Sequence, residues 1–184
     1  MQRTTTVERQ TKETSISVCI DLDRCSDSSF DTGLPFVDHM LEACARHGQF
    51  GLRVKAQGDL QVDAHHTIED LGLTIGRAIR EVLGDKEGIR RYGSAMIPMD
   101  EALVRVVLDI SGRPYLGYRL DPPASLVGGF DVRLFREFFQ ALANSAAITL
   151  HIDALCGEEV HHVFEATFKA FGRALGQACA LDPC

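Results

Sequence analysis

Ala64-His65-His66-Thr67-Ile68-Glu69 recurs as Val160-His161-His162-Val163-Phe164-Glu165 at an offset of 96 residues. At the same offset, Gly76-Arg77-Ala78 recurs as Gly172-Arg173-Ala174. The elements expected before each His pair also follow one order: helix, strand, turn, helix. A duplicated half-domain explains this agreement better than chance. We therefore expect two related halves, residues 1–95 and 96–184, forming one compact unit.

Hydrophobic periodicity outlines both halves. Alternating apolar residues predict strands over residues 14–23, 52–56, 104–110 and 148–154. Apolar residues at helical spacing predict helices over residues 35–47, 64–83, 132–143 and 161–180. Residues 24–32, rich in Asp and Ser, predict a polar loop.

The composition limits the class of protein. The chain has 184 residues, 45% of them hydrophobic, and 19 Lys+Arg against 26 Asp+Glu, a formal charge of −7. This profile excludes a disordered tail, a collagen-like repeat and a coiled coil. With no basic patch and no apolar run near the roughly 20 residues that span a bilayer, we expect neither nucleic-acid nor membrane binding. The first 15 residues are too polar for a secretory signal, so we expect a soluble, cytoplasmic protein.

The cysteines are expected to be reduced and structural. Cys19, Cys44 and Cys156 have apolar neighbours in the sequence, where a free thiol behaves as a small hydrophobe. No C-x-x-C spacing suggests a zinc site or a redox pair among the six, which are Cys19, Cys25, Cys44, Cys156, Cys179 and Cys184.

Each H-H-x-x-E segment has the chemistry of a metal site. On a helix, His65 and Glu69 lie about 40° apart and His66 lies about 100° from His65. Two imidazoles and one carboxylate thus project from one sector of the first turn, and this donor set suits Mn, Fe, Co or Zn. A single His pair could equally be a solvated helix start. Two copies at equivalent positions favour ligation.

The remaining histidines divide by position. His39 and His151 are candidate ligands, although each could also be an ordinary surface residue. His47, near a helix end, is expected to be structural because imidazole suits the helix dipole there. Without His47, six His and two Glu form two sets of three His plus one Glu. Such sets leave coordination positions open, as a catalytic metal requires. The sequence does not partition the ligands between the metals.

The sequence resembles the imidazoleglycerol-phosphate dehydratase family over nearly its whole length. The matching motifs are Gly33-Leu34-Pro35-Phe36-Val37-Asp38-His39-Met40-Leu41, Ala45-Arg46-His47-Gly48, Gly58-Asp59-Leu60, His65-His66-Thr67-Ile68-Glu69-Asp70, Gly88-Ile89-Arg90-Arg91-Tyr92-Gly93-Ser94-Ala95, Pro98-Met99-Asp100-Glu101-Ala102, Ser111-Gly112-Arg113-Pro114-Tyr115 and His161-His162-x-x-Glu165-Ala166-x-Phe168-Lys169-Ala170.

The resemblance implies an enzyme of histidine biosynthesis, a hydro-lyase that converts D-erythro-imidazole glycerol phosphate to imidazole acetol phosphate. The proton that leaves is not next to a carbonyl, so the substrate's imidazole must act as the electron sink. Two metal ions, expected to be Mn²⁺, would stabilise the imidazolate by Lewis acidity while a base removes the C–H proton.

The resemblance also implies residue roles. The metal ligands would be His39, His65, His66, Glu69, His151, His161, His162 and Glu165. Glu13 would transfer a proton or contact a substrate hydroxyl, and Lys169 would contact the substrate. Arg91 and Arg113 would hold the phosphate, a task that suits the planar guanidinium. Taken alone, Glu13 and Lys169 would pass for ordinary surface residues.

The family fold implied is α/β, of α+β type, with helices sandwiched between two mixed four-stranded sheets. The family's metals help to assemble a shell of 24 subunits with active sites at subunit interfaces. The family also continues past the last helix with a short Ser/Thr-Lys-Gly phosphate-binding segment. This chain stops at Asp182-Pro183-Cys184, so either that segment was left out of this sequence or the phosphate site is incomplete in the sequence as given. We expect metal binding to survive its loss.

Two rival functions use the same residues. In a dinuclear metallohydrolase the metals would activate water, but such a site would want bridging carboxylates where this chain offers mostly His. In a non-enzymatic protein the His clusters would be structural metal sites that hold an oligomer together. That interpretation leaves Glu13, Arg91 and Arg113 without a role.

Overall fold

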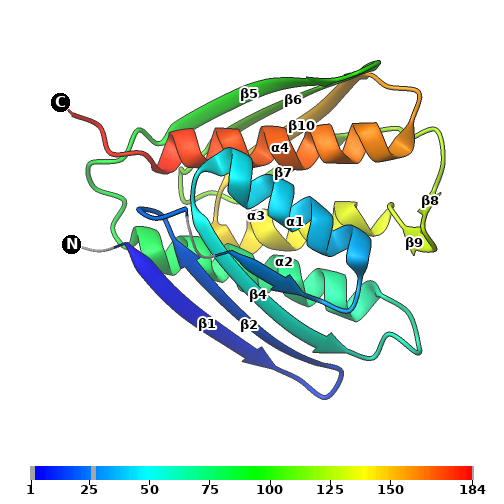
Figure 1. Cartoon of the computed structure of the whole chain (residues 1–184). Helices are drawn as coiled ribbons and strands as arrows, with labels where there is room; N and C mark the ends of the chain where they lie inside the picture. The colour runs from blue at the N-terminus through cyan, green and yellow to red at the C-terminus, as the bar shows by residue number, and fades with distance from the viewer. Residues whose placement is uncertain (1–2, 26–27, 184) are drawn as a thin grey trace.

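The computed structural model describes residues 3–25 and 28–183. Two four-stranded sheets enclose a layer of four helices (Figure 1). The first sheet has the order β1-β2-β4-β3, in which β3 is parallel to β4 and the other neighbours are antiparallel. Its strands are β1 (Thr4–Gln10), β2 (Thr14–Asp21), β3 (Ser29–Asp31) and β4 (Gly51–Gly58).

The second sheet repeats this arrangement. Its order is β5-β6-β10-β7, with β7 parallel to β10 and the other neighbours antiparallel. Its strands are β5 (Tyr92–Met99), β6 (Ala102–Asp109), β7 (Tyr115–Arg119) and β10 (Thr149–Cys156), and a separate small ribbon is formed by β8 (Leu126–Val127) and β9 (Phe130–Asp131). Both sheets are therefore mixed, as the predicted fold class requires.

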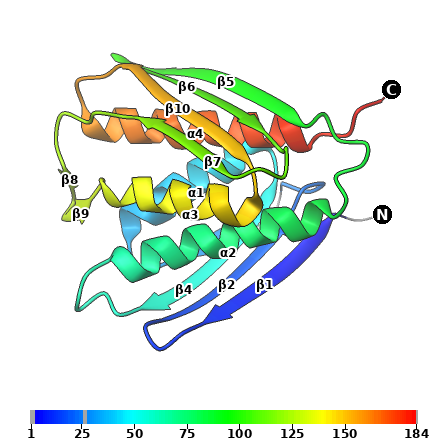
Figure 2. The same ribbon diagram turned by 180° about the vertical axis from the view of Figure 1, so that it is seen from behind.

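Each helix of the first half packs on a helix of the second half. The helices are α1 (Pro35–Gly48), α2 (His65–Leu83), α3 (Leu134–Ala146) and α4 (Val160–Cys179). Helix α1 of the first half packs on α4 of the second, and α3 of the second half packs on α2 of the first (Figures 1 and 2). A Cβ atom on Gly172 of α4 would lie 2.1 Å from the carbonyl oxygen of Cys44 on α1. Glycine is therefore required where these two backbones meet.

An aromatic core fills the space between the helices. Phe135 is fully buried, and its ring centroid lies 4.9 Å from that of Phe168 and 5.2 Å from that of Phe164. Phe135 occupies the position that corresponds to His39 at the 96-residue offset. The second half has thus used this position for packing, so only α1 presents a histidine there.

Each predicted helix and strand is present, with ends that shift by up to three residues. The predicted loop over residues 24–32 is wrong in part, because β3 adds a short parallel strand beside β4. Cys156 has apolar neighbours in the sequence but is exposed, where the pairing of β10 with β6 becomes irregular between Ala154 and Cys156. Cys44 is buried as predicted, and Cys184 lies outside the described residues.

The halves join through the connection at residues 84–91. The predicted boundary between residues 95 and 96 falls inside β5, and β5 pairs with β6 of the second sheet. We propose that the boundary between the halves lies in that connection. None of the helices described in the structure is long and apolar enough to cross a membrane.

Candidate metal centre

Both His pairs lie at the start of a helix, at the same end of the molecule. His65 and His66 are the first two residues of α2, and His161 and His162 lie in the first turn of α4. The carboxylate of Glu159 caps α4 by accepting a hydrogen bond from the backbone N–H of His162 at 2.9 Å. The duplicated segments thus start two equivalent helices, as their spacing predicted.

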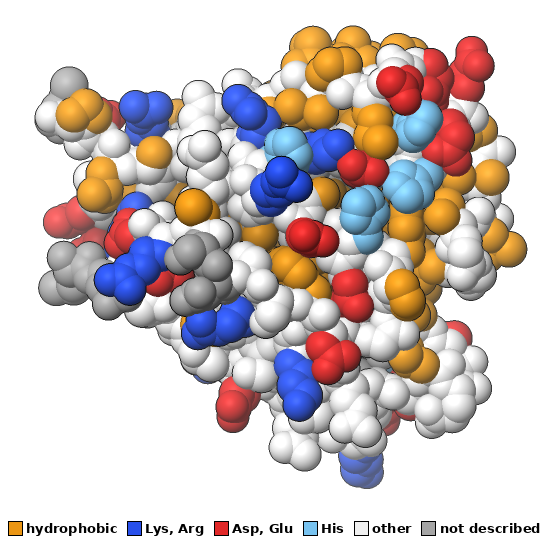
Figure 3. Space-filling model, viewed as in Figure 1, with side chains coloured by type: hydrophobic (Ala, Val, Ile, Leu, Met, Phe, Trp, Pro, Cys, Tyr) orange, Lys and Arg blue, Asp and Glu red, His pale blue; other side chains and the backbone are white. Residues whose placement is uncertain are grey.

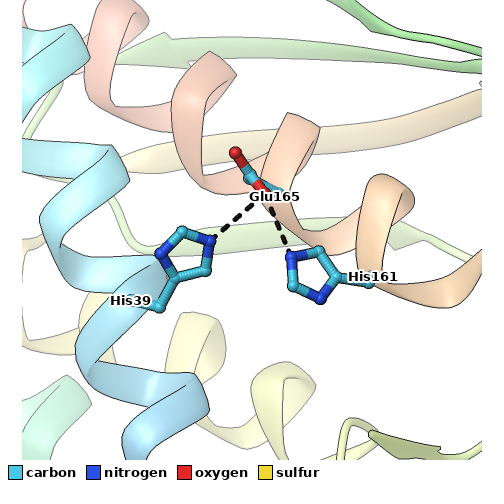
Figure 4. Close-up of side chains that lie close together, drawn as sticks. All are labelled: His39, His161 and Glu165. Atoms are coloured by element: carbon cyan, nitrogen blue, oxygen red, sulfur yellow. Dashed lines mark hydrogen bonds and ion pairs between the residues drawn. The ribbon is translucent and has the colours of Figure 1, made fainter.

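Three predicted ligands converge where α1 meets α4. Glu165 Oε2 lies 3.2 Å from His39 Nε2 and 3.1 Å from His161 Nε2 (Figure 4). One donor atom from each of the three side chains fits within 4.8 Å of the other two. Two imidazole nitrogens and a carboxylate oxygen form a donor set that suits a divalent transition metal. We call His39, His161 and Glu165 the α1–α4 cluster.

Lys169 fixes the carboxylate of this cluster. Its ammonium lies 2.6 Å from Glu165 Oε1, one turn further along α4. Burial alone would raise the pKa of Glu165, but Lys169 and the two histidines hold that pKa at about 2. Glu165 is therefore ionised, with Oε2 turned towards the imidazoles. Lys169 was predicted to contact substrate, and its position beside the cluster is compatible with that role.

The equivalent set on α2 has two members. His65 Nε2 lies 3.7 Å from Glu69 Oε2, and about half of each side chain is exposed. A third imidazole is missing because Phe135, in the position equivalent to His39, is buried in the aromatic core. His65 nevertheless lines the same cavity, of about 790 Å³, as His39 and His161 of the α1–α4 cluster.

The second histidine of each pair binds a carboxylate. Asp59 Oδ2 lies 3.0 Å from His66 Nδ1, and Glu101 Oε2 lies 2.8 Å from His162 Nδ1. These hydrogen bonds raise the pKa of His66 and of His162, and the one to His162 lowers the pKa of Glu101 to about 2. No role was predicted for Asp59 or Glu101. The one signal in the sequence was that both residues lie in segments that match the family, because Glu101 lies 61 residues from its partner.

His151 lies apart from the other histidines. It projects from the outer face of the second sheet, between the inward-facing Leu150 and Ile152, as its strand pattern predicted. Its Nδ1 atom is 3.3 Å from Arg119 Nη2, and its ring is 5.4 Å from that of Tyr115. One chain therefore does not bring all eight predicted ligands together.

The two predicted phosphate-binding arginines share one carboxylate. Asp109 binds Arg91 at 2.7 Å and lies 4.0 Å from Arg113. Arg91 has a φ of 70°, a left-handed conformation that is uncommon for a residue with a side chain. These arginines lie at one end of β5, and the hairpin that holds Glu101 beside α4 lies at the other. The eight residues of β5 separate the two ends by about 23 Å.

Glu13 lies in the β1–β2 hairpin, at the same end of the molecule as the start of α2 (Figure 2). Its charge acts on His66 and adds to the effect of Asp59 in raising the pKa of that imidazole. Within residues 3–25 and 28–183, the Glu13 carboxylate makes no hydrogen bond or ion pair. It is thus a free carboxylate beside a predicted ligand.

His47 was predicted to be structural, and that role stays a prediction. It lies in the last turn of α1, where burial and then the nearby cations Lys169, Arg173 and Arg46 lower its pKa. His47 lines a second cavity, of about 690 Å³, together with Arg3, Arg90 and Arg173.

On the surface, histidines and acidic side chains gather where α4 begins (Figure 3).

The chain matches known proteins over its whole length. Residues 32–175 match the family described as imidazoleglycerol-phosphate dehydratase. The imidazoleglycerol-phosphate dehydratase of Thioalkalivibrio sulfidiphilus is 58% identical over 99% of this chain and 92% of its own length. That of Geobacter metallireducens is 51% identical over 100% of this chain and 94% of its own length.

Solved structures agree with these matches. The crystal structure of imidazoleglycerol-phosphate dehydratase from Staphylococcus aureus superposes with a TM-score of 0.88 at 42% identity, covering 97% of this chain and 99% of that one. The structure from Pyrococcus furiosus, in complex with (S)-C348, superposes with a TM-score of 0.85 at 40% identity, covering 96% of this chain and 95% of that one. The chain therefore belongs to the imidazoleglycerol-phosphate dehydratase family and is an enzyme, a dehydratase.

Proposed function

We propose that this enzyme dehydrates D-erythro-imidazole glycerol phosphate to imidazole acetol phosphate in histidine biosynthesis, at a centre of two divalent metal ions, preferably Mn²⁺. The observation that carries the proposal is the convergence of His39, His161 and Glu165 beside a cavity that His65 also lines. Family membership favours this reaction over hydrolysis and over a purely structural role for the metals.

The proposed ligands fit such metals by their chemistry. Neutral imidazoles and ionised carboxylates are the donors that Mn²⁺, Fe²⁺ and Zn²⁺ accept, and all the proposed ligands are of these two kinds. When bound, the metals would supply Lewis acidity towards the charge that develops on the imidazole ring of the substrate. The residues we assign are His39, His65, His66, Glu69, His151, His161, His162 and Glu165.

A complete site requires more than one copy of the chain. His151, Arg91 and Arg113 lie away from the α1–α4 cluster, so we propose that neighbouring subunits supply them, in an assembly of 24 subunits with active sites at the interfaces. The exposed side chains of Met96, Val107 and Tyr115 on the outer face of the second sheet support burial of this face between copies.

The polar residues divide the remaining tasks. Arg91 and Arg113 would bind the two charges of the phosphate, and Lys169 would contact the substrate while it holds Glu165. Glu13 would accept the C–H proton as the enol forms, since its carboxylate has no competing partner among the described residues.

We also propose a cytoplasmic location. The thiols of Cys19, Cys25, Cys44, Cys156 and Cys179 are free, as is usual in a reducing compartment.

Substitution of Glu13 tests the proposal. Purified protein carrying the family's C-terminal Ser-Lys-Gly segment should turn over imidazole glycerol phosphate when loaded with Mn²⁺. Glu13→Gln should lower kcat by about 10²–10⁴-fold, the usual contribution of a general base, with metal content unchanged. Glu8→Gln, on an exposed residue of β1, is the control. No turnover by the loaded wild-type protein would contradict the function, and loss of metal from Glu13→Gln would contradict the role of Glu13.

A further inference from the structure

A chain of hydroxyl groups runs from the β1–β2 hairpin to α2. The backbone N–H groups of Glu13 and Thr14 both donate to Thr11 Oγ1, at 3.1 and 3.0 Å. Thr11 Oγ1 lies 3.1 Å from Thr14 Oγ1, and Thr14 Oγ1 lies 2.5 Å from Asp70 Oδ2. Thr14 and Asp70 are both buried. We call Thr11, Thr14 and Asp70 the hydroxyl chain.

The direction of each hydrogen bond is fixed by chemistry. A carboxylate only accepts, so the Thr14 hydroxyl hydrogen points to Asp70. The Thr14 oxygen must then accept the hydrogen of Thr11, which leaves the lone pairs of Thr11 for the two backbone N–H groups. Every donor in the hydroxyl chain therefore has one acceptor. The series of hydrogen bonds ends at the charged carboxylate of Asp70, which accepts the strongest of them.

The hydroxyl chain links Glu13 to the proposed metal site. Asp70 directly follows Glu69 and lies one turn after His66 on α2. The backbone of Glu13 is thereby tied to the same helical turn that carries these proposed ligands. This arrangement leaves the Glu13 side chain exposed and unpaired among the described residues.

The second half of the molecule has a different arrangement. At the 96-residue offset, Asp70 corresponds to Ala166, whose side chain cannot accept a hydrogen bond. The β5–β6 hairpin is tied to α4 by the side chain of Glu101, which binds His162 and the backbone N–H groups of Glu158 and Glu159. In the second half, the carboxylate of the hairpin, Glu101, itself binds the helix. In the first half, Thr14 of the hairpin binds the helix through Asp70, so the Glu13 carboxylate is left without such a bond.

We infer that Thr11, Thr14 and Asp70 are positioning residues that hold the Glu13 carboxylate at the metal centre for proton transfer. The inference rests on the proposed role of Glu13. Displacing a reacting group by about 1 Å can cost about a hundredfold in rate. Loss of the hydroxyl chain should therefore lower kcat while the metals and the substrate-binding groups stay in place.

Two substitutions of Thr14 provide the main test. Thr14→Val keeps the shape but removes the hydroxyl, and should lower kcat by about tenfold to a hundredfold with KM and metal content within twofold of wild type. Thr14→Ser keeps the hydroxyl and should restore kcat to within about threefold. Arg9→Gln removes the ion pair to the other carboxylate oxygen of Asp70, Oδ1, which lies 2.8 Å from Arg9 Nε, and should leave kcat unchanged. Equal kcat in the Val and Ser variants would overturn the inference.

A second measurement needs neither substrate nor metal. In metal-free protein, Thr11→Val should speed hydrogen exchange of the Glu13 and Thr14 amides, because it removes their acceptor, while exchange within α2 stays slow. Unchanged exchange at these two amides would contradict the hydroxyl chain. Thr11→Val also replaces Thr14→Val in the kinetic test if the latter fails to fold.

A double variant separates this inference from the proposed function. In the Glu13→Gln background, Thr14→Val should cause no further loss of kcat, because the group it positions is already gone. A further loss of tenfold or more would show that the hydroxyl chain acts on something other than Glu13. If Glu13→Gln alone keeps full activity, the proposed role of Glu13 fails, and the hydrogen-exchange result still reports on the hydroxyl chain.

Discussion

Two imidazoles in this protein are oriented by carboxylates. Asp59 and Glu101 bind the Nδ1 atoms of His66 and His162 and leave the Nε2 atoms as candidates for metal binding. A carboxylate in this position fixes the ring and makes the metal-bound imidazole a stronger donor. It also raises the pKa of the free imidazole, which must lose its proton before a metal can bind. The same hydrogen bond thus favours metal binding at a pH above the imidazole pKa and opposes metal binding at a pH below it.

The pH dependence of metal uptake should reveal this balance. Glu101→Gln removes the charge that raises the pKa of His162, so half-maximal metal content should shift to lower pH. At high pH the affinity should fall about 10–100-fold, the usual effect of losing such a partner. Metal content measured against pH checks both effects, with Glu158→Gln as the control. An unchanged midpoint would contradict the ligand role of His162.

Without metal, the pH dependence of stability has the opposite sign. The pKa values of His66 and His162 are raised above 6.5 in the folded state by Asp59 and Glu101. The stabilisation is therefore complete below about pH 6.5 and is lost as the pH rises through the raised pKa values. The unfolding free energy of metal-free protein, followed by urea titration from pH 6 to 8.5, should show this fall. The double variant Asp59→Asn with Glu101→Gln should show a smaller fall in unfolding free energy over this pH range.

Helix packing decides whether the α1–α4 cluster forms at all. His39 comes from α1, and both of its partners come from α4. The two helices approach most closely where Gly172 and Gly176 of α4 face the carbonyl oxygens of Cys44 and Gly48 on α1. The distance from His39 to Glu165 thus depends on residues that carry no functional group.

Gly172→Ala should therefore weaken both the fold and metal binding. The new Cβ would lie 2.1 Å from the Cys44 carbonyl oxygen, which forces the helices apart at a cost of about 1–3 kcal/mol. The higher helix propensity of alanine returns only about 1 kcal/mol. Urea unfolding and metal titration check the two effects, with Arg173→Ala on the exposed face as control. Undiminished stability would contradict the close approach.

The sequence predicted the elements that have strong periodicity and missed the others. Helix α2 and strand β2 show regular apolar spacing and were predicted within two residues. Strand β1 has one buried residue, Val7, and β3 has three residues in all, so neither has a period to detect. Edge strands of this kind form because a neighbouring strand offers hydrogen bonds, and a single sequence does not show that neighbour.

The sequence indicated the residues of the α1–α4 cluster but only part of the geometry around them. The repeated segments pointed to His161 and Glu165, the count of His and Glu made His39 a candidate, and the family resemblance assigned it as a ligand. The carboxylates of Asp59 and Glu101 and the hydroxyl chain were not foreseen, because the bonds that join them to α2 and α4 span 7, 56 and 61 residues with no periodic relation. Contacts of this kind follow from the tertiary fold alone.

On the scale of the whole molecule, the two sheets present different outer faces. The first sheet exposes polar side chains such as Ser15, Arg53 and Lys55. The second exposes Met96, Val107 and Tyr115, with exposed fractions of 54%, 41% and 55%, around the half-buried His151. Val107 and His151 are direct cross-strand neighbours. An interface on the second sheet would thus bury apolar surface and a proposed ligand together.

A charge on this face should prevent assembly. Val107→Glu places a carboxylate in the proposed interface, so we expect smaller species in analytical ultracentrifugation and loss of metal. Ser17→Glu, opposite Lys55 on the first sheet, is the matched control and should assemble normally. Normal assembly of Val107→Glu would contradict an interface on the second sheet.

The packing of each first-half helix on a second-half helix affects how the protein folds during its synthesis. As the polypeptide leaves the ribosome, α1 and α2 emerge together with the first sheet, long before their partners α3 and α4 exist. Helix α1 cannot take its final packing until α4 has been synthesised. The N-terminal half therefore emerges with apolar helix faces uncovered. Its tertiary folding follows the synthesis of α3 and α4 and cannot precede it.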